Sequence, residues 1–275
     1  MKITVDYIRN ARKEHRKISM LTCYDYSFAR ILDQTAVDIL LIGDSLGTVI
    51  KGEGTTENVT VDEIVYHCKA VRRGAQRALV VADLPLETFK GTERENLETI
   101  VRIHTETGVD AVKIEGAGTM CPLIKKVIEE GIPVMGHIGL TPQTASSLGG
   151  FKVQGKDKAS AERILKAAHD LEACGVFSVV MECVIADVAA VISKKIAVPT
   201  IGIGAGKGCD GQVLVLYDML VLFTDKKLKF ARRYAEGSDM IATAANQFVQ
   251  DIRTDRFPDM NESFTVPSLD FLKQL

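Results

Sequence analysis

Short apolar segments alternate with helix-like segments along this chain, and this alternation constrains the fold more than any other feature. The apolar segments are rich in β-branched and small residues and are predicted to be strands, at residues 18–23, 38–44, 78–83, 109–116, 133–137, 177–182, 199–203 and 212–217. Amphipathic or capped segments between them are predicted helices, at residues 25–34, 60–73, 92–107, 120–130, 159–174 and 186–196. Strands that are apolar on both faces are typical of a parallel sheet covered by helices.

Eight strand–helix units within about 250 residues predict a (β/α)8 barrel, that is, a TIM barrel. Residues 3–16 are a predicted capping helix, residues 239–253 a helix near the C-terminus, and a polar tail begins at about residue 254. No linker composition precedes the tail, so we assign residues 1–275 to one barrel domain. The alternative is an open doubly wound sheet, which periodicity alone does not exclude.

Composition narrows the class of protein. The hydrophobic fraction of 46% and charged fraction of 25% are typical of a globular protein, and the net charge of −2 gives no reason to expect nucleic acid or an anionic membrane as partner. The N-terminal residues lack the apolar run of a signal peptide, and the apolar stretch at 213–223 is too short to span a bilayer. The six cysteines form no C-x-x-C pair, which favours reduced thiols. We therefore expect a cytoplasmic enzyme or binding protein.

The segment 109–116 places charges where a core is expected. Side chains alternate along a strand, so Lys113 and Glu115 share one face while Val112 and Ile114 share the other. If the apolar pair packs against helices, the charged pair points into the centre of the sheet or barrel. Buried charges are costly unless they are paired or bind a metal or a ligand.

Four acids and one histidine lie at predicted strand ends, where a barrel carries its active site: Asp44, Asp83, Glu115, Glu182 and His137. Each acid alone could instead be a helix N-cap. That alternative is weaker for the whole set, because several are followed by glycine loops or by Pro85 rather than by a helix. Crowded carboxylates repel one another unless a cation lies among them, and an oxygen-only ligand set favours Mg²⁺ or a similar ion.

Two loops are candidates for the same site. Residues 138–156 form a long segment rich in Gly, Ser and Thr, which is typical of a functional loop. The glycines of 202–206 do not have the dinucleotide-binding spacing. They could cradle a phosphate, or form a turn that brings the backbone close to a ligand or to the next strand.

Several short motifs occur in a fixed order along the chain, and together they indicate a family. They are Tyr24-Asp25-Tyr26-Ser27, Gly43-Asp44-Ser45-Leu46-Gly47, Val71-Arg72-Arg73-Gly74, Ala82-Asp83-Leu84-Pro85, Val112-Lys113-Ile114-Glu115-Gly116, Gly136-His137-Ile138-Gly139-Leu140-Thr141-Pro142-Gln143, Met181-Glu182-Cys183 and Gly202-Ile203-Gly204-Ala205-Gly206. Over about residues 5–260 the chain closely resembles the ketopantoate hydroxymethyltransferase family.

The resemblance implies a fold, an assembly and a reaction. The family has a barrel of the phosphoenolpyruvate/pyruvate type and forms homodecamers built as pentamers of dimers. Its members transfer a hydroxymethyl group from 5,10-methylenetetrahydrofolate to 3-methyl-2-oxobutanoate, through a Mg²⁺-stabilised enolate. The product is 2-dehydropantoate, an intermediate of pantothenate and coenzyme A biosynthesis.

The resemblance also implies a role for each matching residue. The metal-site carboxylates, some of them acting through water, would be Asp44, Asp83 and Glu115. The substrate-binding residues would be Asp44, Ser45, Asp83, Lys113 and, near the substrate, His137. Glu182 would be the catalytic base.

Three other functions stay open at this point. A lyase of the same superfamily would use a similar set of acids with Mg²⁺, although no cysteine-bearing lid motif is evident. A phosphate-binding barrel isomerase would depend on the glycine loop at 202–206 and would not need the carboxylates. A non-catalytic binding module would have no use for Lys113 opposite Glu182.

Overall fold

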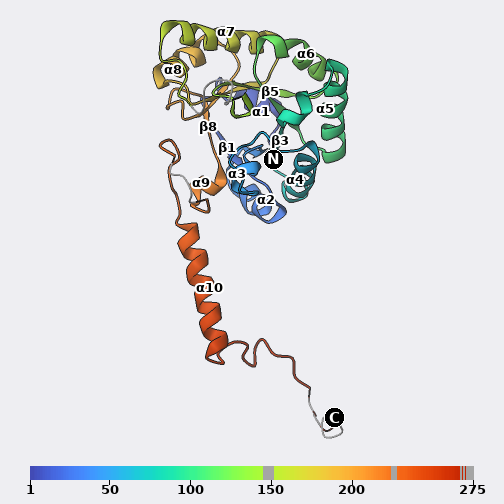
Figure 1. Cartoon of the computed structure of the whole chain (residues 1–275), viewed down its shortest axis with the longest axis vertical. Coiled ribbons are helices and arrows are strands. Elements are labelled where there is room, and N and C mark those ends of the chain that lie inside the picture. The colour runs from blue at the N-terminus through green and yellow to red at the C-terminus, as the bar shows by residue number, and fades with distance from the viewer. Residues whose placement is uncertain (145–151, 224–227, 267, 269, 271–275) are drawn as a thin grey trace.

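The computed structural model describes residues 1–144, 152–223, 228–266, 268 and 270. Within these residues, eight parallel strands pair in chain order and close into a barrel (Figure 1). The strands are β1 (Ile18–Thr22), β2 (Ile39–Ile42), β3 (Leu79–Asp83), β4 (Ala111–Glu115), β5 (Val134–Gly139), β6 (Ser178–Glu182), β7 (Thr200–Ile203) and β8 (Gly211–Leu214). The barrel prediction is confirmed, because β1 pairs with β8 and an open sheet would leave both unpaired on one side.

Helices surround the barrel, and local sequence sets where several of them begin and end. The α-helices are α1 (Val5–Asn10), α2 (Tyr26–Asp33), α3 (Leu46–Val49), α4 (Val61–Gly74), α5 (Glu93–Thr107), α6 (Cys121–Glu129), α7 (Lys158–Cys174), α8 (Ala186–Lys195), α9 (Leu216–Met219) and α10 (Gly237–Arg253). Capping boxes start α4 at Thr60 and α5 at Thr92, as their S/T-x-x-E patterns indicate. Gly108 and Gly175 end α5 and α7 in the left-handed conformation.

The apolar residues form two layers, one on each side of the barrel wall. The inner layer includes Leu41, Val81 and Ala111, and the outer layer, under the helices, includes Val112 and Ile114. Side chains alternate along β4, so Lys113 and Glu115 point to the inner side, as the sequence predicts.

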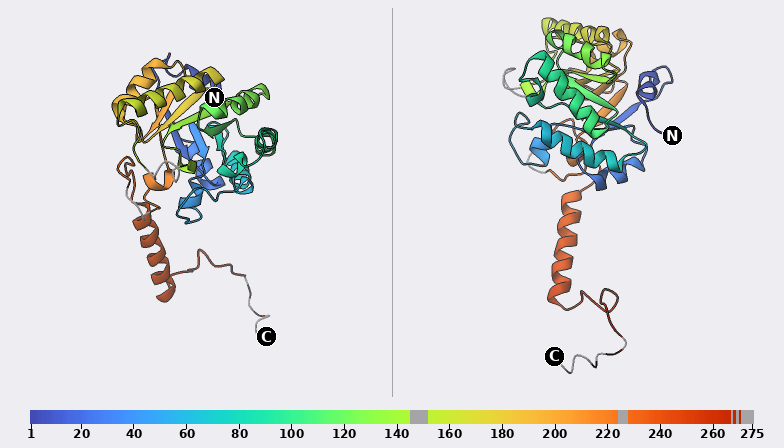
Figure 2. Two further views of the ribbon diagram at one scale, coloured as in Figure 1. Left: turned by 45° about the horizontal axis from the view of Figure 1, so that its top comes forward. Right: turned by 90° about the vertical axis from the view of Figure 1, so that its right-hand side faces the viewer.

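The C-terminal helix is set apart from the barrel. Figures 1 and 2 show α10 projecting away from the strands and helices, with the described part of the tail continuing beyond it. Apolar side chains on this helix are solvent-exposed in the single chain, among them Met240, Ile241, Phe248 and Ile252. No helix within the described ranges is both long and apolar enough to cross a membrane.

Some predicted boundaries were wrong. The eighth strand ends at Leu214, and Tyr217 lies in α9 instead, with its ring 5.7 Å from the Tyr24 ring and 6.0 Å from the Phe28 ring. This aromatic packing explains why the apolar run does not continue as a strand. The N-terminal helix ends at Asn10, before a series of turns that closes with His15 at φ 52°. The loop after β2 contains the short helix α3, which was not predicted.

Candidate functional site

The carboxyl ends of β2 to β5 bring together the predicted charged residues in one buried cluster. Its members are Asp44, Asp83, Lys113, Glu115 and His137, each between 2% and 8% exposed. Asp83 and Lys113 are register partners on β3 and β4, and Glu115 and His137 are partners on β4 and β5. Parallel strands thus place residues from distant parts of the sequence at one rim.

Lys113 and Asp83 form the shortest ion pair of this cluster within the described residues. The Lys113 Nζ lies 2.6 Å from Asp83 Oδ1. Burial lowers the pKa of Lys113, but the charges of Asp83, Glu115 and Asp44 outweigh it and raise that pKa. Lys113 therefore stays protonated and supplies a fixed positive charge inside the barrel.

His137 lies between two acids. Its Nδ1 is 3.2 Å from Glu115 Oε1 and 3.2 Å from Lys113 Nζ, while its Nε2 is 3.5 Å from Glu182 Oε2. Burial and the Lys113 charge lower the pKa of His137, but Glu115 and Glu182 outweigh them and raise it to about 9. The same contacts with His137 and Lys113 overcome burial and lower the pKa of Glu115.

Asp44 is the acid of the cluster that lacks a cation. Among the described residues, no basic side chain forms an ion pair with it, whereas Asp83 pairs with Lys113 and Glu115 with His137. Burial, together with the charges of Asp83 and Glu115, raises the pKa of Asp44 to about 8. Burial also raises the pKa of Asp83, in spite of Lys113. The charge of Lys113 lowers the pKa of Asp44, but less than burial and the two acids raise it. A buried carboxyl crowded by acids, with no ion-pair partner among the described residues, is a setting in which a divalent cation would be favourable.

The acids of the cluster could hold a hard cation only if water or substrate supplied the remaining ligands. In the described part of the chain, no group of three or more His, Cys, Asp and Glu side chains is arranged to hold a metal ion by itself. Mg²⁺ commonly binds through one or two carboxylates and completes its shell with water and substrate. The donors of Asp44 and Asp83 therefore fit this ion, with water and substrate as the remaining ligands.

Ser45 and Glu182 flank the cluster. The Ser45 Oγ lies 2.8 Å from the buried Tyr24 hydroxyl, and either oxygen can be the donor. A Cβ at the neighbouring Gly43 would lie 2.9 Å from Ser45 Oγ, so a larger residue there would crowd the Ser45 side chain. Glu182 ends β6 with its side chain 18% exposed, which makes it the acid most open to a ligand.

Sequence reasoning missed two residues of this region, Tyr24 and Gln143. Gln143 donates from Nε2 to Asp44 Oδ2 at 3.2 Å and to the Leu84 carbonyl at 2.8 Å. Both residues stand in the motifs that carry the family resemblance, but a lone Tyr or Gln in a loop has no periodicity that indicates its role. Residues 145–151 of the predicted functional loop 138–156 lie outside the described residues.

The glycine loop after β7 is explained by packing. A Cβ at Gly206 would lie 2.5 Å from the Ala186 Cβ, and one at Gly208 would lie 2.5 Å from the Ala190 Cβ. Both neighbours belong to α8, so these glycines let the loop lie directly against that helix. The neighbour is thus a helix, and not the ligand or the next strand of the sequence-based alternatives, and the packing accounts for Gly206 and for Gly208 beyond the motif.

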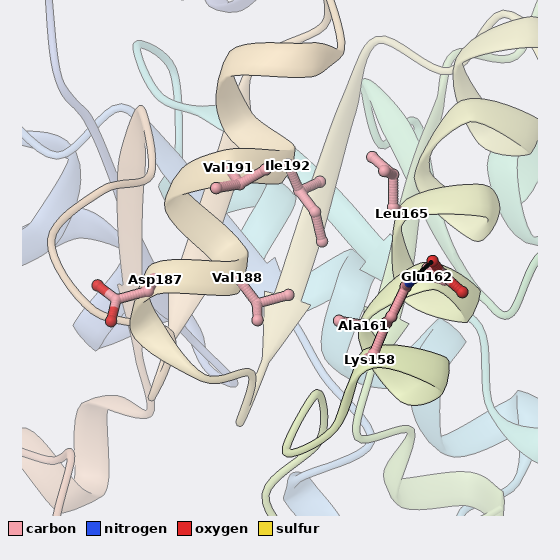
Figure 3. Close-up of a pocket in the computed structure, with 8 residues that line it drawn as sticks. All are labelled: Lys158, Ala161, Glu162, Leu165, Asp187, Val188, Val191 and Ile192. Atoms are coloured by element: carbon pink, nitrogen blue, oxygen red, sulfur yellow. Dashed lines mark ion pairs between the residues drawn. The ribbon is translucent and has the colours of Figure 1, made fainter.

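An apolar groove also lies on the outside of the barrel, between α7 and α8 (Figure 3). Its lining includes Leu165 of α7 with Val188, Val191 and Ile192 of α8. None of the clustered charged residues lines it. Three charged residues, Lys158, Glu162 and Asp187, also line the groove, and none of them belongs to the predicted site.

Two solved structures of other enzymes have a similar fold. A phosphonopyruvate hydrolase in complex with oxalate and Mg²⁺ is 10% identical, with a TM-score of 0.60 over 100% of this chain and 94% of that chain. A 2,3-dimethylmalate lyase of the PEP mutase/isocitrate lyase superfamily is 14% identical, with a TM-score of 0.58 over 96% of this chain and 92% of that chain. At these identities the likeness shows the fold alone, a closed parallel (β/α)8 barrel.

Sequence comparison is more specific. The model of the ketopantoate hydroxymethyltransferase family matches residues 2–260. The 3-methyl-2-oxobutanoate hydroxymethyltransferase of Syntrophus aciditrophicus is 47% identical over 96% of this chain and 97% of its own length. The enzyme of the same name from Clostridium botulinum is 43% identical over 99% of both chains. The chain therefore belongs to the ketopantoate hydroxymethyltransferase family.

Proposed function

We propose that this protein transfers a hydroxymethyl group from 5,10-methylenetetrahydrofolate to 3-methyl-2-oxobutanoate, giving 2-dehydropantoate for pantothenate and coenzyme A biosynthesis. The observation that carries the proposal is the buried cluster of Asp44, Asp83 and Lys113 at the carboxyl rim. The relatives' names support the oxo acid and the transferred group. The folate follows from the family resemblance.

Asp44 and Asp83 are the proposed carboxylates of a Mg²⁺ site, with Glu115 acting through water. When bound there, the ion would supply a Lewis acid that polarises the ketone of the 2-oxo acid. The raised pKa of Asp44 supports this assignment, because a cation would favour the ionised carboxylate that burial and its acidic neighbours disfavour. Other divalent ions with oxygen preference could serve at the same position.

Lys113, Ser45 and His137 are proposed to bind the substrate. The Lys113 ammonium is a fixed positive charge, so it can stabilise negative charge that develops on the substrate oxygen. The Ser45 hydroxyl is oriented by Tyr24 and can hydrogen-bond a substrate carboxylate. His137 lies beside both Lys113 and Glu182, and so can keep the two at opposite sides of the substrate.

Glu182 is the proposed base that removes the proton from C3 of the oxo acid. Its side chain is more exposed than the other acids of the rim, so it can reach a bound ligand. The enolate carbon then forms a bond to the methylene carbon of the folate, both bonds from that carbon to N5 and N10 break, and water supplies the hydroxyl oxygen. The proton taken up by Glu182 and one proton of the water end on N5 and N10, so that tetrahydrofolate leaves.

Assembly and location are part of the same proposal. We propose a cytoplasmic homodecamer without nucleic-acid or membrane partners, as in the family. The exposed apolar side chains of α10 support self-association, because contiguous apolar surface of this kind is usually covered by another chain. Light scattering of the full chain would measure the assembly size.

Hydrogen exchange tests the first half of the reaction without the folate. Wild-type protein with Mg²⁺ and 3-methyl-2-oxobutanoate in D₂O is expected to exchange the C3 hydrogen, and Glu182→Gln to lower the rate about 10²–10⁴-fold, the usual contribution of a general base. Glu98→Gln, on the exposed face of α5, is the matched control with an unchanged rate. Undiminished exchange in Glu182→Gln would remove this residue from the role of base.

Addition of the folate then identifies the transferase. Methylenetetrahydrofolate is expected to divert the exchanging enolate into 2-dehydropantoate, detected by mass spectrometry. Exchange without this product would point to another enolate chemistry on the same rim.

A further inference from the structure

Gln143 is a buried amide at the site with no role in the proposed reaction. It lies in the loop after β5, in the short 3-10 helix Pro142–Thr144, and is 4% exposed. A glutamine side chain is rarely buried to this extent unless its polar atoms are hydrogen-bonded.

The contacts of Gln143 connect three strand ends. Its Nε2 donates to Asp44 Oδ2 at 3.2 Å, beyond β2, and to the Leu84 carbonyl at 2.8 Å, beyond β3. Its backbone N–H donates to Glu115 Oε2 at 3.3 Å, at the end of β4. The two acids that it contacts are proposed cation ligands, and the carbonyl fixes the amide relative to the barrel wall.

Within the described residues, Gln143 provides the hydrogen-bond donor to the Asp44 carboxylate. Asp44 has no ion-pair partner among the described residues, so this bond restricts the rotation of its carboxylate in addition to packing. A carboxylate that must bind a cation is usually oriented by a hydrogen bond from a neighbouring group. Gln143 donates such a hydrogen bond to Asp44.

The neutral amide is chemically suited to the position. A lysine would neutralise Asp44 and compete with a cation, and a glutamate would add negative charge to a cluster where burial already disfavours it. An amide donates two hydrogen bonds without changing the net charge. Gln143 can therefore orient Asp44 and leave its charge available.

We propose that Gln143 is a positioning residue, which holds the carboxylates of Asp44 and Glu115 in the orientation that binds the cation and which touches neither cation nor substrate. This inference rests on the proposed function, because the cation site is part of it. It predicts that loss of the amide weakens cation binding even when no substrate is present.

Titration with Mn²⁺ alone, followed by electron paramagnetic resonance, tests the inference. Gln143→Met keeps the length of the side chain and removes both donors, and is expected to raise the Mn²⁺ dissociation constant about 10–100-fold, as for other groups that orient metal ligands. The matched control is Gln212→Met, because Gln212 Nε2 also donates to a carbonyl, that of Gly206 at 2.9 Å, but on the exposed side of β8. Its dissociation constant is expected to stay at the wild-type value.

A double-mutant cycle separates positioning from a general structural role. In an Asp44→Asn background, Gln143→Met is expected to weaken Mn²⁺ binding much less than it does in the wild type, because the group that it orients has already lost its charge. Equal effects in both backgrounds would overturn the inference. Should Gln143→Met not fold, Gln143→Asn, which keeps the amide on a shorter side chain, is expected to weaken binding in the same direction.

The remaining outcomes are distinguishable from one another. Wild-type protein that binds Mn²⁺ while Gln143→Met binds it equally well would overturn the inference and leave the proposed function intact. Wild-type protein with no Mn²⁺ affinity would contradict the cation site itself, and the inference with it.

Discussion

Acidic residues lie at both ends of this barrel, but the groups that surround them differ. At the amino end, Asp38, Asp110 and Asp210 each stand directly before a strand. Each accepts a backbone N–H from the strand before, with distances of 2.9 Å from Ser19, 2.9 Å from Val80 and 2.8 Å from Thr200. Asp110 and Asp210 also pair with basic side chains, Lys2 at 2.6 Å and Arg12 at 2.5 Å.

At the carboxyl end, the acids are buried together, and Asp44 accepts one side-chain hydrogen bond from the described residues. Burial and mutual repulsion raise the pKa values of Asp44 and Asp83 there. For Asp210 at the other end, burial is outweighed by Arg12 and the Thr200 N–H, and the pKa is lowered. The difference teaches that the contacts of Asp210 favour its charged form in the fold, whereas burial disfavours the charged forms of Asp44 and Asp83, as expected for acids that await a ligand under the proposed function.

The largest effect is expected from Asp83→Asn, at the carboxyl end. It should lower Mg²⁺-dependent exchange of the oxo acid about a thousandfold, because the Lewis acidity of a bound ion contributes several kcal/mol to such a step. The exchange rate as a function of Mg²⁺ concentration measures this. Unchanged Mg²⁺ dependence would count against Asp83 as a ligand. It would also remove the proposed functional difference between the acids at the two ends of the barrel.

A smaller effect on stability, and none on chemistry, is expected from Asp210→Asn at the amino end. Loss of its charged hydrogen bonds should lower the free energy of unfolding by about 1.5–3 kcal/mol at neutral pH. Because the pKa of Asp210 is lowered in the folded state, its stabilisation is present above about pH 4 and is lost as the pH falls through the folded-state value. The variant and the wild type should therefore converge in acid.

Chemical denaturation across a pH series measures this convergence. Exchange activity of Asp210→Asn at neutral pH is the control and should match that of the wild type. A variant that loses exchange while it remains folded would show that the amino end also serves the reaction.

The smallest effect is expected from Asp38→Asn. Asp38 Oδ2 accepts from the Ser19 N–H at 2.9 Å and from the Ser19 Oγ at 2.8 Å, and an amide oxygen can accept both bonds. The free energy of unfolding should fall by less than about 1 kcal/mol, within the usual contribution of one neutral hydrogen bond. A loss as large as that of Asp210→Asn would mean that charge matters at the amino end even without a basic partner.

Much of this arrangement could be predicted from alternation along single strands. The alternation of side chains along residues 112–115 predicted that Lys113 and Glu115 face inward. The structure confirms it, because Val112 and Ile114 lie in the outer layer under the helices. Acids at strand ends indicated a common rim, because parallel strands in a barrel all end on the same side. These inferences need no knowledge of which strands are neighbours.

The partners of each charged group could not be predicted, because they depend on strand register and loop path. Asp83 faces Lys113 only because β3 and β4 pair as they do. Gln143 reaches Asp44 because a loop folds back over two strand ends, which no local pattern of residues encodes. The eighth strand was predicted too long for a related reason, since the contacts of Tyr217 with Tyr24 and Phe28 are formed only in the folded chain.

The central claim is that acids from separate strands bind one divalent cation beside a 2-oxo acid. Its most direct test is an anomalous difference map from crystals grown with Mn²⁺ and 3-methyl-2-oxobutanoate. We predict a single peak between Asp44 and Asp83, with the oxo acid next to Lys113. A peak elsewhere in the barrel, or an oxo acid bound away from this rim, would contradict the account.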